Sequence, residues 1–215
     1  MSPVLREGDL LPEDEERFLA ASVLGVDTET RGLVPHRDRL CLVQLHDGTE
    51  DPAVLVRIAR AAEPRAPRLA RVLVGSPLKV FHYARFDLAT LRRHLSIEVQ
   101  PAFCTMVASK LVRTYTNHHG LRDLVADLLG IEMDKRAQQT DWGADSYSRA
   151  QLEYAASDVT VLVPAFQRLK QMLEREERWD LAVRCSAMVP LLAELDLQGY
   201  DRDIFRLGPP PGPGA

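Results

Sequence analysis

Short apolar runs separated by polar turns make up the first part of the chain. The runs Val23–Asp27 and Leu40–Leu45 have the length that is typical of buried strands. Ala53–Val56 is a weaker run of the same kind, and Lys79–His82 is another short one. The pattern predicts a sheet whose first strands follow one another in hairpin order.

Apolar residues at helical spacing dominate from Arg85 onward. Pro67 lies near the first turn of one predicted helix, and Pro164 predicts a bend inside a longer one. Strands that are then mixed with helices predict an α/β fold, with a mixed β-sheet flanked by α-helices. The predicted helices are Glu13–Ala20, Pro67–Val74, Phe86–Leu95, Thr105–Arg113, Leu121–Leu129, Ser148–Leu173 and Trp179–Leu197.

The length and composition are those of one domain. With 215 residues, of which 46% are hydrophobic and 27% are charged, the chain can bury a core of ordinary size. We expect a single domain over residues 1–207, with its core at about 20–175 and a C-terminal helix at 179–197. The tail GPPPGPGA at 208–215 can form neither a helix nor a strand ladder, so we expect it to be disordered.

The sequence disfavours several classes of protein. No run approaches the roughly 18 apolar residues of a membrane helix, and the acidic N-terminus has no apolar signal core, so we expect a cytoplasmic protein without a membrane partner. Cys41, Cys104 and Cys185 lack metal-site spacing and are expected to be buried thiols. The net charge of −4 lacks the basic footprint of many nucleic-acid binders, but cations bound to acids would reverse that sign locally.

Acidic residues follow two of the predicted strands. Asp27 and Glu29 are two residues apart at the end of the first strand, so they face the same side, where ligands bind in many α/β sheets. Alone, this pair is equally compatible with a solvated strand end. Asp87 follows Lys79–His82 at the start of a helix, where the helix dipole also favours an acid.

A tyrosine and an acid share one face of a later predicted helix. Tyr154 and Asp158 are four residues apart, and the apolar Leu162 continues this face, so we expect it to point inward. A buried carboxylate requires a partner or a metal. Carboxylates favour Mg²⁺ or Mn²⁺, and two such ions roughly 3.5–4 Å apart clamp both reacting oxygens of a phosphodiester. The four acids therefore predict a two-metal site, with Tyr154 placed to orient the attacking water.

Three motifs resemble those of a known superfamily. VDTET, FHYARFD and YAASDV, which hold the acids and the tyrosine, resemble in this order the motifs of the DEDD exonucleases, in the subgroup with a tyrosine at the last motif. RLCLVQL at 39–45 and TDWGADSYSRAQLEYAASDV at 140–159 resemble ribonuclease D and its relatives. From about Leu5 to Phe205 the chain is similar to the nanoRNase C family of short bacterial enzymes, which degrade very short RNAs.

The resemblance implies an RNase H-like 3′→5′ exonuclease fold. It implies hydrolysis of short RNA down to dinucleotides, with release of nucleoside 5′-monophosphates, by a ring-shaped homo-octamer. It also implies two divalent ions, Mg²⁺ or Mn²⁺, held by Asp27, Glu29, Asp87 and Asp158, with Tyr154 positioning the nucleophilic water. The implied substrate-binding residues are Thr30, Gly32, Leu33, His82, Phe86, Arg113 and His118.

Other positions bear on substrate contacts. Many relatives have Asn where this chain has Tyr83, a departure that affects local substrate contacts and not the catalytic acids. The basic segment from Lys110 to Arg122 is either a cap for a substrate 5′-phosphate or a solvated connector. Trp142 could stack a base, but we favour a structural anchor beneath the third motif.

Three functions stay open on the sequence alone. The leading hypothesis is a metal-dependent 3′→5′ exoribonuclease that acts on short single-stranded RNA. The second is a 3′→5′ exodeoxyribonuclease acting on DNA ends in repair, because no residue can be tied to a 2′-hydroxyl. The third is an inactive nucleic-acid-binding module that kept the fold. The intact acids and Tyr154 argue against this third function.

Overall fold

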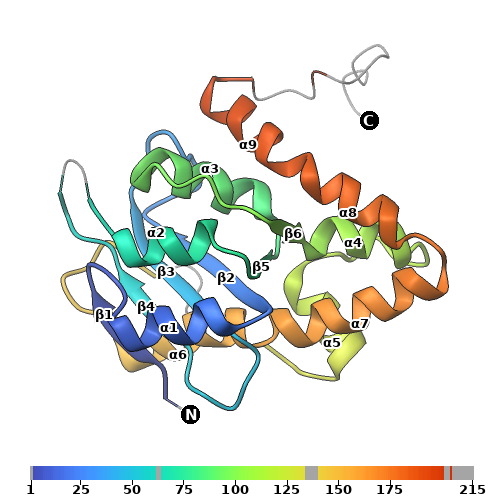
Figure 1. The fold of residues 1–215 in the computed structure, drawn as a ribbon, viewed down its shortest axis with the longest axis horizontal. Helices are drawn as coiled ribbons and strands as arrows, with labels where there is room; N and C mark the ends of the chain where they lie inside the picture. Colours follow the sequence, from blue (N-terminus) through green and yellow to red (C-terminus); the bar gives the residue numbers. More distant parts are fainter. Residues whose placement is uncertain (1, 62–63, 134–139, 201–203, 205–215) are drawn as a thin grey trace.

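The chain folds around one mixed β-sheet (Figure 1). The structure is a computed structural model that describes residues 2–61, 64–133, 140–200 and 204. Within these residues the sheet has six strands in the order β1-β4-β3-β2-β5-β6. The strands are β1 (Val4–Glu7), β2 (Val23–Thr30), β3 (Leu40–His46), β4 (Val54–Arg57), β5 (Leu78–Phe81) and β6 (Ala102–Cys104).

Strand β2 lies inside the sheet and is paired on both sides. It runs antiparallel to β3 and parallel to β5. β3 is also antiparallel to β4, and the outer strands β1 and β6 run parallel to β4 and β5 respectively. This arrangement confirms the predicted mixed sheet and the hairpin order of β2, β3 and β4. Two pairing registers fix the direction in which each side chain of β2 points.

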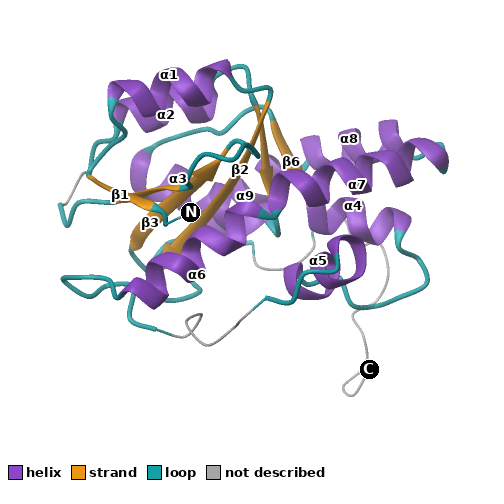
Figure 2. Cartoon of the chain, turned by 90° about the horizontal axis from the view of Figure 1, so that it is seen from below, coloured by secondary structure: helices purple, strands orange, loops and turns teal. Residues whose placement is uncertain are grey.

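Helices cover both faces of the sheet (Figure 2). The helices are α1 (Pro12–Ala20), α2 (Pro67–Val74), α3 (Ala84–Leu95), α4 (Thr105–Val112), α5 (Leu121–Leu129), α6 (Arg149–Thr160), α7 (Leu162–Arg175), α8 (Trp179–Ala187) and α9 (Val189–Leu197). Helices α1, α2 and α3 pack with Leu24, Val26 and Val43 on one face. On the other face, α6 packs with Leu42 and Leu55. Alternate residues of β2 and β3 therefore point into different helical layers.

Two short strands were not predicted from the sequence. β1 lies before the first predicted helix, in a segment for which no strand was predicted, and β6 precedes α4. They have four and three residues, which is too short for an alternating pattern to show. β2 is longer than predicted, because it continues to Thr30 and does not end at Asp27. Both Asp27 and Glu29 thus lie within a paired strand.

Two helices predicted as continuous are each divided at a proline. The predicted helix Ser148–Leu173 ends at Thr160 and resumes at Leu162. Pro164 has no N–H to donate to the carbonyl of Thr160, four residues earlier, so the break lies where this bond is lost. The predicted helix Trp179–Leu197 is likewise divided into α8 and α9, with a proline in the first turn of α9.

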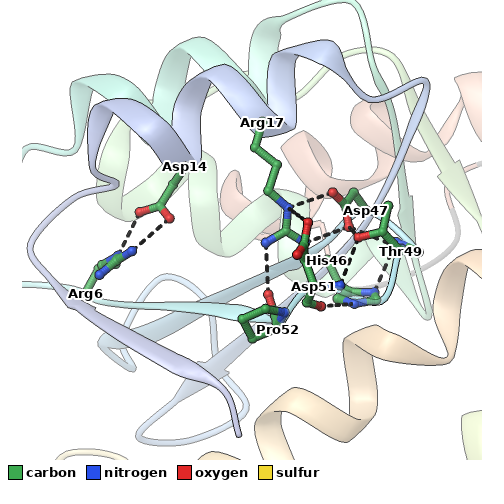
Figure 3. A network of polar contacts seen from close by, with 9 residues as sticks. Arg6, Asp14, Arg17, His46, Asp47, Thr49, Asp51 and Pro52 are labelled. Carbon is green, nitrogen blue, oxygen red and sulfur yellow. Dashed lines mark hydrogen bonds and ion pairs between the residues drawn. The ribbon is translucent and has the colours of Figure 1, made fainter. Parts of the chain in front are cut away.

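Arginine side chains tie α1 to the sheet (Figure 3). Arg17 donates to both carboxylate oxygens of Asp47 at 2.7 Å and to the carbonyl of Pro52 at 3.0 Å. Asp47 also accepts a hydrogen bond of 2.7 Å from the Thr49 hydroxyl. The turn between β3 and β4 is therefore fastened to α1 by a bidentate ion pair with little exposure of the Asp47 side chain.

Other sequence-based expectations concern the cysteines, the tail and membranes. Cys41 and Cys104 are buried free thiols as expected, and Cys185 is half-buried. No helix within the described ranges is long and apolar enough to cross a membrane. The tail at 208–215 and residue 207, where the predicted domain ends, lie outside the described residues.

Candidate active site

Strand β2 directs its acids to one side and the threonine between them to the other. Asp27 and Glu29 share a face, and Glu29 is paired with Leu42 of β3. Because Leu42 packs against Ala155, this face looks toward α6. Thr28 points to the opposite layer, which contains α3. The motif VDTET therefore contributes to both layers from one strand.

Gly25 lets α6 approach this face closely. A Cβ atom at Gly25 would lie only 2.6 Å from the carbonyl oxygen of Val159, so any larger residue would push the helix away. Asp158 precedes Val159 on α6 and is buried. The small residue in β2 thus brings the Asp158 carboxylate to the acids of the strand. Asp27, Glu29 and Asp158 each offer an oxygen, and these oxygens lie within 4.8 Å of one another.

Asp87 reaches the same region from the α3 side of the sheet. It lies in the first turn of α3 and is buried, with 3% of its surface exposed. The Thr28 hydroxyl donates a hydrogen bond of 2.6 Å to Asp87 Oδ1. Although Asp87 is outside the closest group of three acids, its charge acts on both Asp27 and Glu29. The four predicted acids are therefore brought together, three in close contact and one beside them.

Crowding of the carboxylates changes their acidity. Burial, together with the charges of Asp87, Asp158 and Glu29, raises the pKa of Asp27 well above its usual range. Burial and the charges of Asp158 and Asp87 raise the pKa of Glu29 to about 9. Burial also raises the pKa of Asp87 to about 7 and that of Asp158 to about 6. Such a site favours protons or cations over free negative charge.

The donors of this site fit hard divalent cations. Every candidate ligand is a carboxylate oxygen, whereas zinc would favour His or Cys. Oxygens within 4.8 Å of one another can meet around an ion at the short bond lengths of Mg²⁺ or Mn²⁺. A bound cation would also relieve the repulsion that raises the pKa values of the acids. The chemistry of the donors and their spacing therefore agree with the predicted metal site.

Tyr154 lies one helical turn before Asp158 on α6, and both residues line one cleft in the protein surface. Its hydroxyl hydrogen-bonds to the Asp158 carboxylate, and burial with this negative neighbour raises the pKa of the phenol. The hydroxyl therefore keeps its proton. Trp142, with 2% of its surface exposed, packs near the Tyr154 ring at a centroid distance of 6.3 Å. This placement agrees with the anchoring role favoured for Trp142.

Asp27, Glu29 and Asp158 line a cleft of about 720 Å³. Leu33 lies at the cleft with 85% of its surface exposed, which is unusual for a leucine. A Cβ atom at Gly32 would clash with the Asp38 carboxylate, so a larger residue there would displace Asp38 from its hydrogen bond with the Val34 N–H group. The Thr30 hydroxyl donates to the Gly32 carbonyl in this turn. Of the predicted substrate-binding residues, the cleft is lined by Thr30, Gly32, Leu33, His82 and Phe86.

His82 is fixed in the cleft wall by a chain of hydrogen bonds. The Thr105 hydroxyl donates to the Phe81 carbonyl at 3.0 Å, so it accepts from His82 Nδ1 at 2.9 Å. Burial lowers the pKa of His82 to about 4. The imidazole is therefore neutral at physiological pH, and it does not supply positive charge to a bound phosphate.

Tyr83 adopts a left-handed backbone conformation at the edge of the cleft. Its φ is 64° and its ψ is 42°, and it forms the N-cap of α3. Asparagine tolerates this conformation better than tyrosine does. The backbone therefore gives a physical reason for the Asn that the family resemblance leads us to expect here. Tyr83 itself is exposed and adds an aromatic ring to the cleft wall.

Two predicted substrate-binding residues do not line the cleft of the single chain. Arg113 is buried, and its guanidinium bonds to Asp127 at 2.9 Å and to the His118 carbonyl at 2.9 Å. His118 is exposed outside the cleft lining. Arg122, by contrast, is an exposed cleft residue at the start of α5. The sequence could not show that Asp127 would engage Arg113.

Thr28 is a residue of the site that was not predicted from the sequence. It stands between the two acids of β2, and period-two geometry alone places it on the other face. Its target, Asp87, comes from a segment far along the chain. Recognition of Thr28 therefore required knowing that α3 packs on that face.

A family model described as "3′-5′ exonuclease" matches residues 7–174. DNA polymerase I of Aquifex aeolicus is 35% identical over 210 residues, which cover 89% of this chain and 34% of that protein. Ribonuclease D of Acidiphilium cryptum is 34% identical over 174 residues, which cover 81% of this chain and 44% of that protein. The chain therefore spans less than half the length of these two relatives.

Two solved structures of NrnC from Brucella melitensis match nearly the whole chain. The structure with bound Mg²⁺ has a TM-score of 0.89 and 41% identity, and the structure bound to pGG has a TM-score of 0.90 and 42% identity. Each match covers 97% of this chain and 100% of the other. These likenesses confirm the predicted RNase H-like exonuclease fold.

Proposed function

Because the chain belongs to the 3′-5′ exonuclease family and is ribonuclease D-like, we propose that it hydrolyses short single-stranded RNA from the 3′ end. The products are nucleoside 5′-monophosphates, and the substrates are short RNA oligonucleotides down to dinucleotides. The observation that carries this proposal is the convergence of Asp27, Glu29 and Asp158, with Asp87 beside them, in a cleft that also contains Tyr154. The similar NrnC structure with pGG supports a short substrate.

The four acids hold two divalent cations, Mg²⁺ or Mn²⁺, in this proposal. Asp27, Glu29 and Asp158 form the group of closest oxygens, and Asp87 completes it from the α3 side. Two such ions supply charge stabilisation to the attacking and leaving oxygens of a phosphodiester. The Mg²⁺ in the NrnC structure supports this choice of cation. The protein holds the carboxylate oxygens in fixed positions, because they belong to β2, to α3 on one face of the sheet and to α6 on the other.

Tyr154 orients the attacking water. Its raised pKa keeps the phenol protonated, so the hydroxyl can donate one hydrogen bond and accept another. It acts here as a positioning donor and acceptor, not as a strong base. Tyr154→Phe removes the hydroxyl and leaves the ring near Trp142. We expect kcat to fall about 100-fold or more. Tyr200→Phe, which removes an exposed hydroxyl outside the cleft lining, serves as a control that keeps its activity.

The cleft wall binds the 3′-terminal nucleotide. Leu33 offers an exposed apolar surface to a base, and Phe86 contributes an aromatic ring. Neutral His82 offers a polar edge without a full positive charge. Leu33→Ala is expected to raise KM for short RNA more than it lowers kcat, because Leu33 touches a base and not the reacting phosphate.

Recognition of a substrate 5′-phosphate is assigned to the segment from Lys110 to Arg122. Within one chain Arg122 is the basic residue of this segment at the cleft, and Arg113 is occupied by Asp127. Dinucleotides with and without a 5′-phosphate would be compared for Arg122→Ala and Arg113→Ala. A loss confined to phosphorylated dinucleotides supports the capping role, and an equal loss on both rejects it.

The proposal includes assembly into a homo-octameric ring. α8 and α9 expose apolar residues, which agrees with contacts between subunits. The most exposed of these are Leu181, Val183, Met188 and Leu191. Light scattering of the purified chain would measure the mass directly. A monomer at micromolar concentration would reject the ring without affecting the proposed chemistry.

Turnover of labelled RNA from two to seven nucleotides, with Mg²⁺, Mn²⁺ or chelator, tests the function. We expect metal-dependent release of mononucleotides and their loss in Asp158→Asn. Activity that persists in this variant or in excess chelator would refute the mechanism.

The main alternative is a 3′→5′ exodeoxyribonuclease acting on DNA ends, which the similarity to DNA polymerase I supports. The same assay on matching DNA tests it, and a strong preference for DNA would favour this alternative. The absence of any turnover on RNA and DNA would favour an inactive binding module.

A further inference from the structure

Gln44 in β3 is a buried polar residue whose amide is unused by the fold. None of its surface is exposed, and neither its Nε2 nor its Oε1 has a hydrogen-bond partner among the described residues. Burying an unpaired amide is unfavourable, so an apolar side chain of the same size would suit the fold as well or better. The amide therefore points to a role outside folding.

The strand register places Gln44 directly beside a candidate metal ligand. The antiparallel pairing of β2 and β3 sets Gln44 opposite Asp27. Side chains of such a pair project from the same face, with Cβ atoms about 4.5–5.5 Å apart. Leu42, two residues before Gln44, packs against Ala155, so this face is the one covered by α6. Gln44 thus lies behind Asp27, on the buried side of the acid site.

Asp27 is the charged residue that the strand pairing sets beside Gln44 on this face. On the far side β4 places the apolar Leu55 opposite Gln44. His46, two residues later, uses both ring nitrogens for hydrogen bonds to the backbone of the following turn. The side-chain amide of glutamine is long enough to reach across a strand pair to the carboxylate of the opposite residue.

We propose that Gln44 is a positioning residue of the metal site, and that its Nε2–H group turns to donate to the Asp27 carboxylate oxygen that faces away from the cations once these are bound. This inference rests on the proposed function. A hydrogen bond of this kind fixes the orientation of a ligand carboxylate. A neutral amide suits the place, because a cation would compete with the metal and another acid would add to the repulsion.

Gln44→Met tests the inference, because methionine has a similar length and no hydrogen-bonding amide. Calorimetric titration of the full chain with Mn²⁺, without substrate, would measure metal affinity directly. We expect Mn²⁺ affinity to fall about 10- to 100-fold, while the Tm in chelator is unchanged or higher. Gln44→Leu provides a second apolar variant. Thr90→Val is the control. It removes a buried hydroxyl that, like the Gln44 amide, has no hydrogen-bond partner among the described residues, and it should keep wild-type Mn²⁺ affinity.

The outcomes separate this inference from the proposed function. If the wild-type chain binds Mn²⁺ no better than Asp27→Asn does, the proposed metal function fails. If the wild type binds Mn²⁺ and Gln44→Met binds it equally well, the role of Gln44 is overturned while the function stands. A lower Tm in chelator with unchanged Mn²⁺ affinity would make Gln44 a residue of the fold and would also overturn the inference.

Discussion

The Thr28 hydroxyl donates a hydrogen bond of 2.6 Å to Asp87, which links the central strand to α3 within the acid site. This contact crosses from β2 to the layer opposite the one that holds Asp158. It also opposes the effect of burial on the Asp87 carboxylate, since a donor to the charged form lowers its pKa. Thr28 therefore both orients Asp87 and helps to keep it ionised for a cation.

Thr28→Val should weaken the metal site while leaving the fold intact. Valine has nearly the shape of threonine, so packing against α3 is kept while the donor is lost. We expect the apparent Mg²⁺ affinity to fall about 10- to 100-fold. Activity measured against Mg²⁺ concentration gives this value. Thr90→Val, on the same helix as Asp87, is the matched control, and an equal loss in both variants would contradict the role of Thr28.

Tyr83→Asn should make the chain more stable and its substrate binding weaker. Asparagine tolerates the left-handed backbone at this position better, so we expect a gain of roughly 0.5–1 kcal/mol in the free energy of unfolding. Loss of the ring from the cleft wall should raise KM for short RNA. Ser96→Asn relieves a similar conformation at the C-cap of α3. It should show the gain in stability without the change in KM, as measured by chemical denaturation and steady-state kinetics.

The metal-free chain should lose stability as the pH rises. Asp27, Glu29, Asp87 and Asp158 all have pKa values raised above their usual range in the folded chain. The folded state therefore binds more protons than the unfolded state, and this contribution is lost as the pH rises through the folded-state values. In chelator we expect the Tm to fall between pH 6 and 9.

Added Mg²⁺ should restore the Tm most strongly at the alkaline end, where it displaces fewer protons. Asp27→Asn removes one of the repelling charges and should flatten the decline in chelator. A Tm that rises with pH in the metal-free wild type would contradict this account of the acids.

Asp47→Asn should destabilise the fold without changing catalysis. It breaks the bidentate pair with Arg17, which joins α1 to the turn between β3 and β4 (Figure 3). We expect a loss of about 2 kcal/mol in the free energy of unfolding, with kcat unchanged at 25 °C. Arg149→Met removes an exposed pair with Glu153 and should cost less than about 0.5 kcal/mol.

The pH dependence of this difference is a second check on Asp47. Burial opposes ionisation of Asp47, but hydrogen bonds from Arg17 and Thr49 outweigh it and lower the pKa of this carboxyl. The stabilisation is therefore present above the unfolded-state pKa and is lost as the pH falls through the folded-state value. The gap between wild type and Asp47→Asn should shrink below about pH 4.

The site was predictable where local periodicity determines direction. Asp27 and Glu29 share a face because a strand has period two, and Tyr154 and Asp158 share one because a helix brings residues four apart together. Both relationships hold whatever the rest of the chain does. The convergence of the two pairs was a hypothesis supported by motif order. Only the packing of α6 on β2 determines how close the carboxylate oxygens lie to one another.

Other parts of the site depend on partners distant in sequence. Gln44 lies in an apolar run, and only the register with β2 sets it opposite Asp27. Arg113 looked free in a basic segment, but a later helix supplies Asp127 to it. β1 escaped notice because an edge strand of four residues owes its structure to β4 and not to its own sequence.

Because α6 packs closely against Gly25, the site can be complete only after α6 has been synthesised. A growing chain makes Asp27, Glu29 and Asp87 well before α6 has been added. Until α6 docks over Gly25, Asp158 and Tyr154 are missing from the cleft. On the proposed mechanism, a growing chain therefore gains nuclease activity only after α6 has been synthesised and has docked on β2.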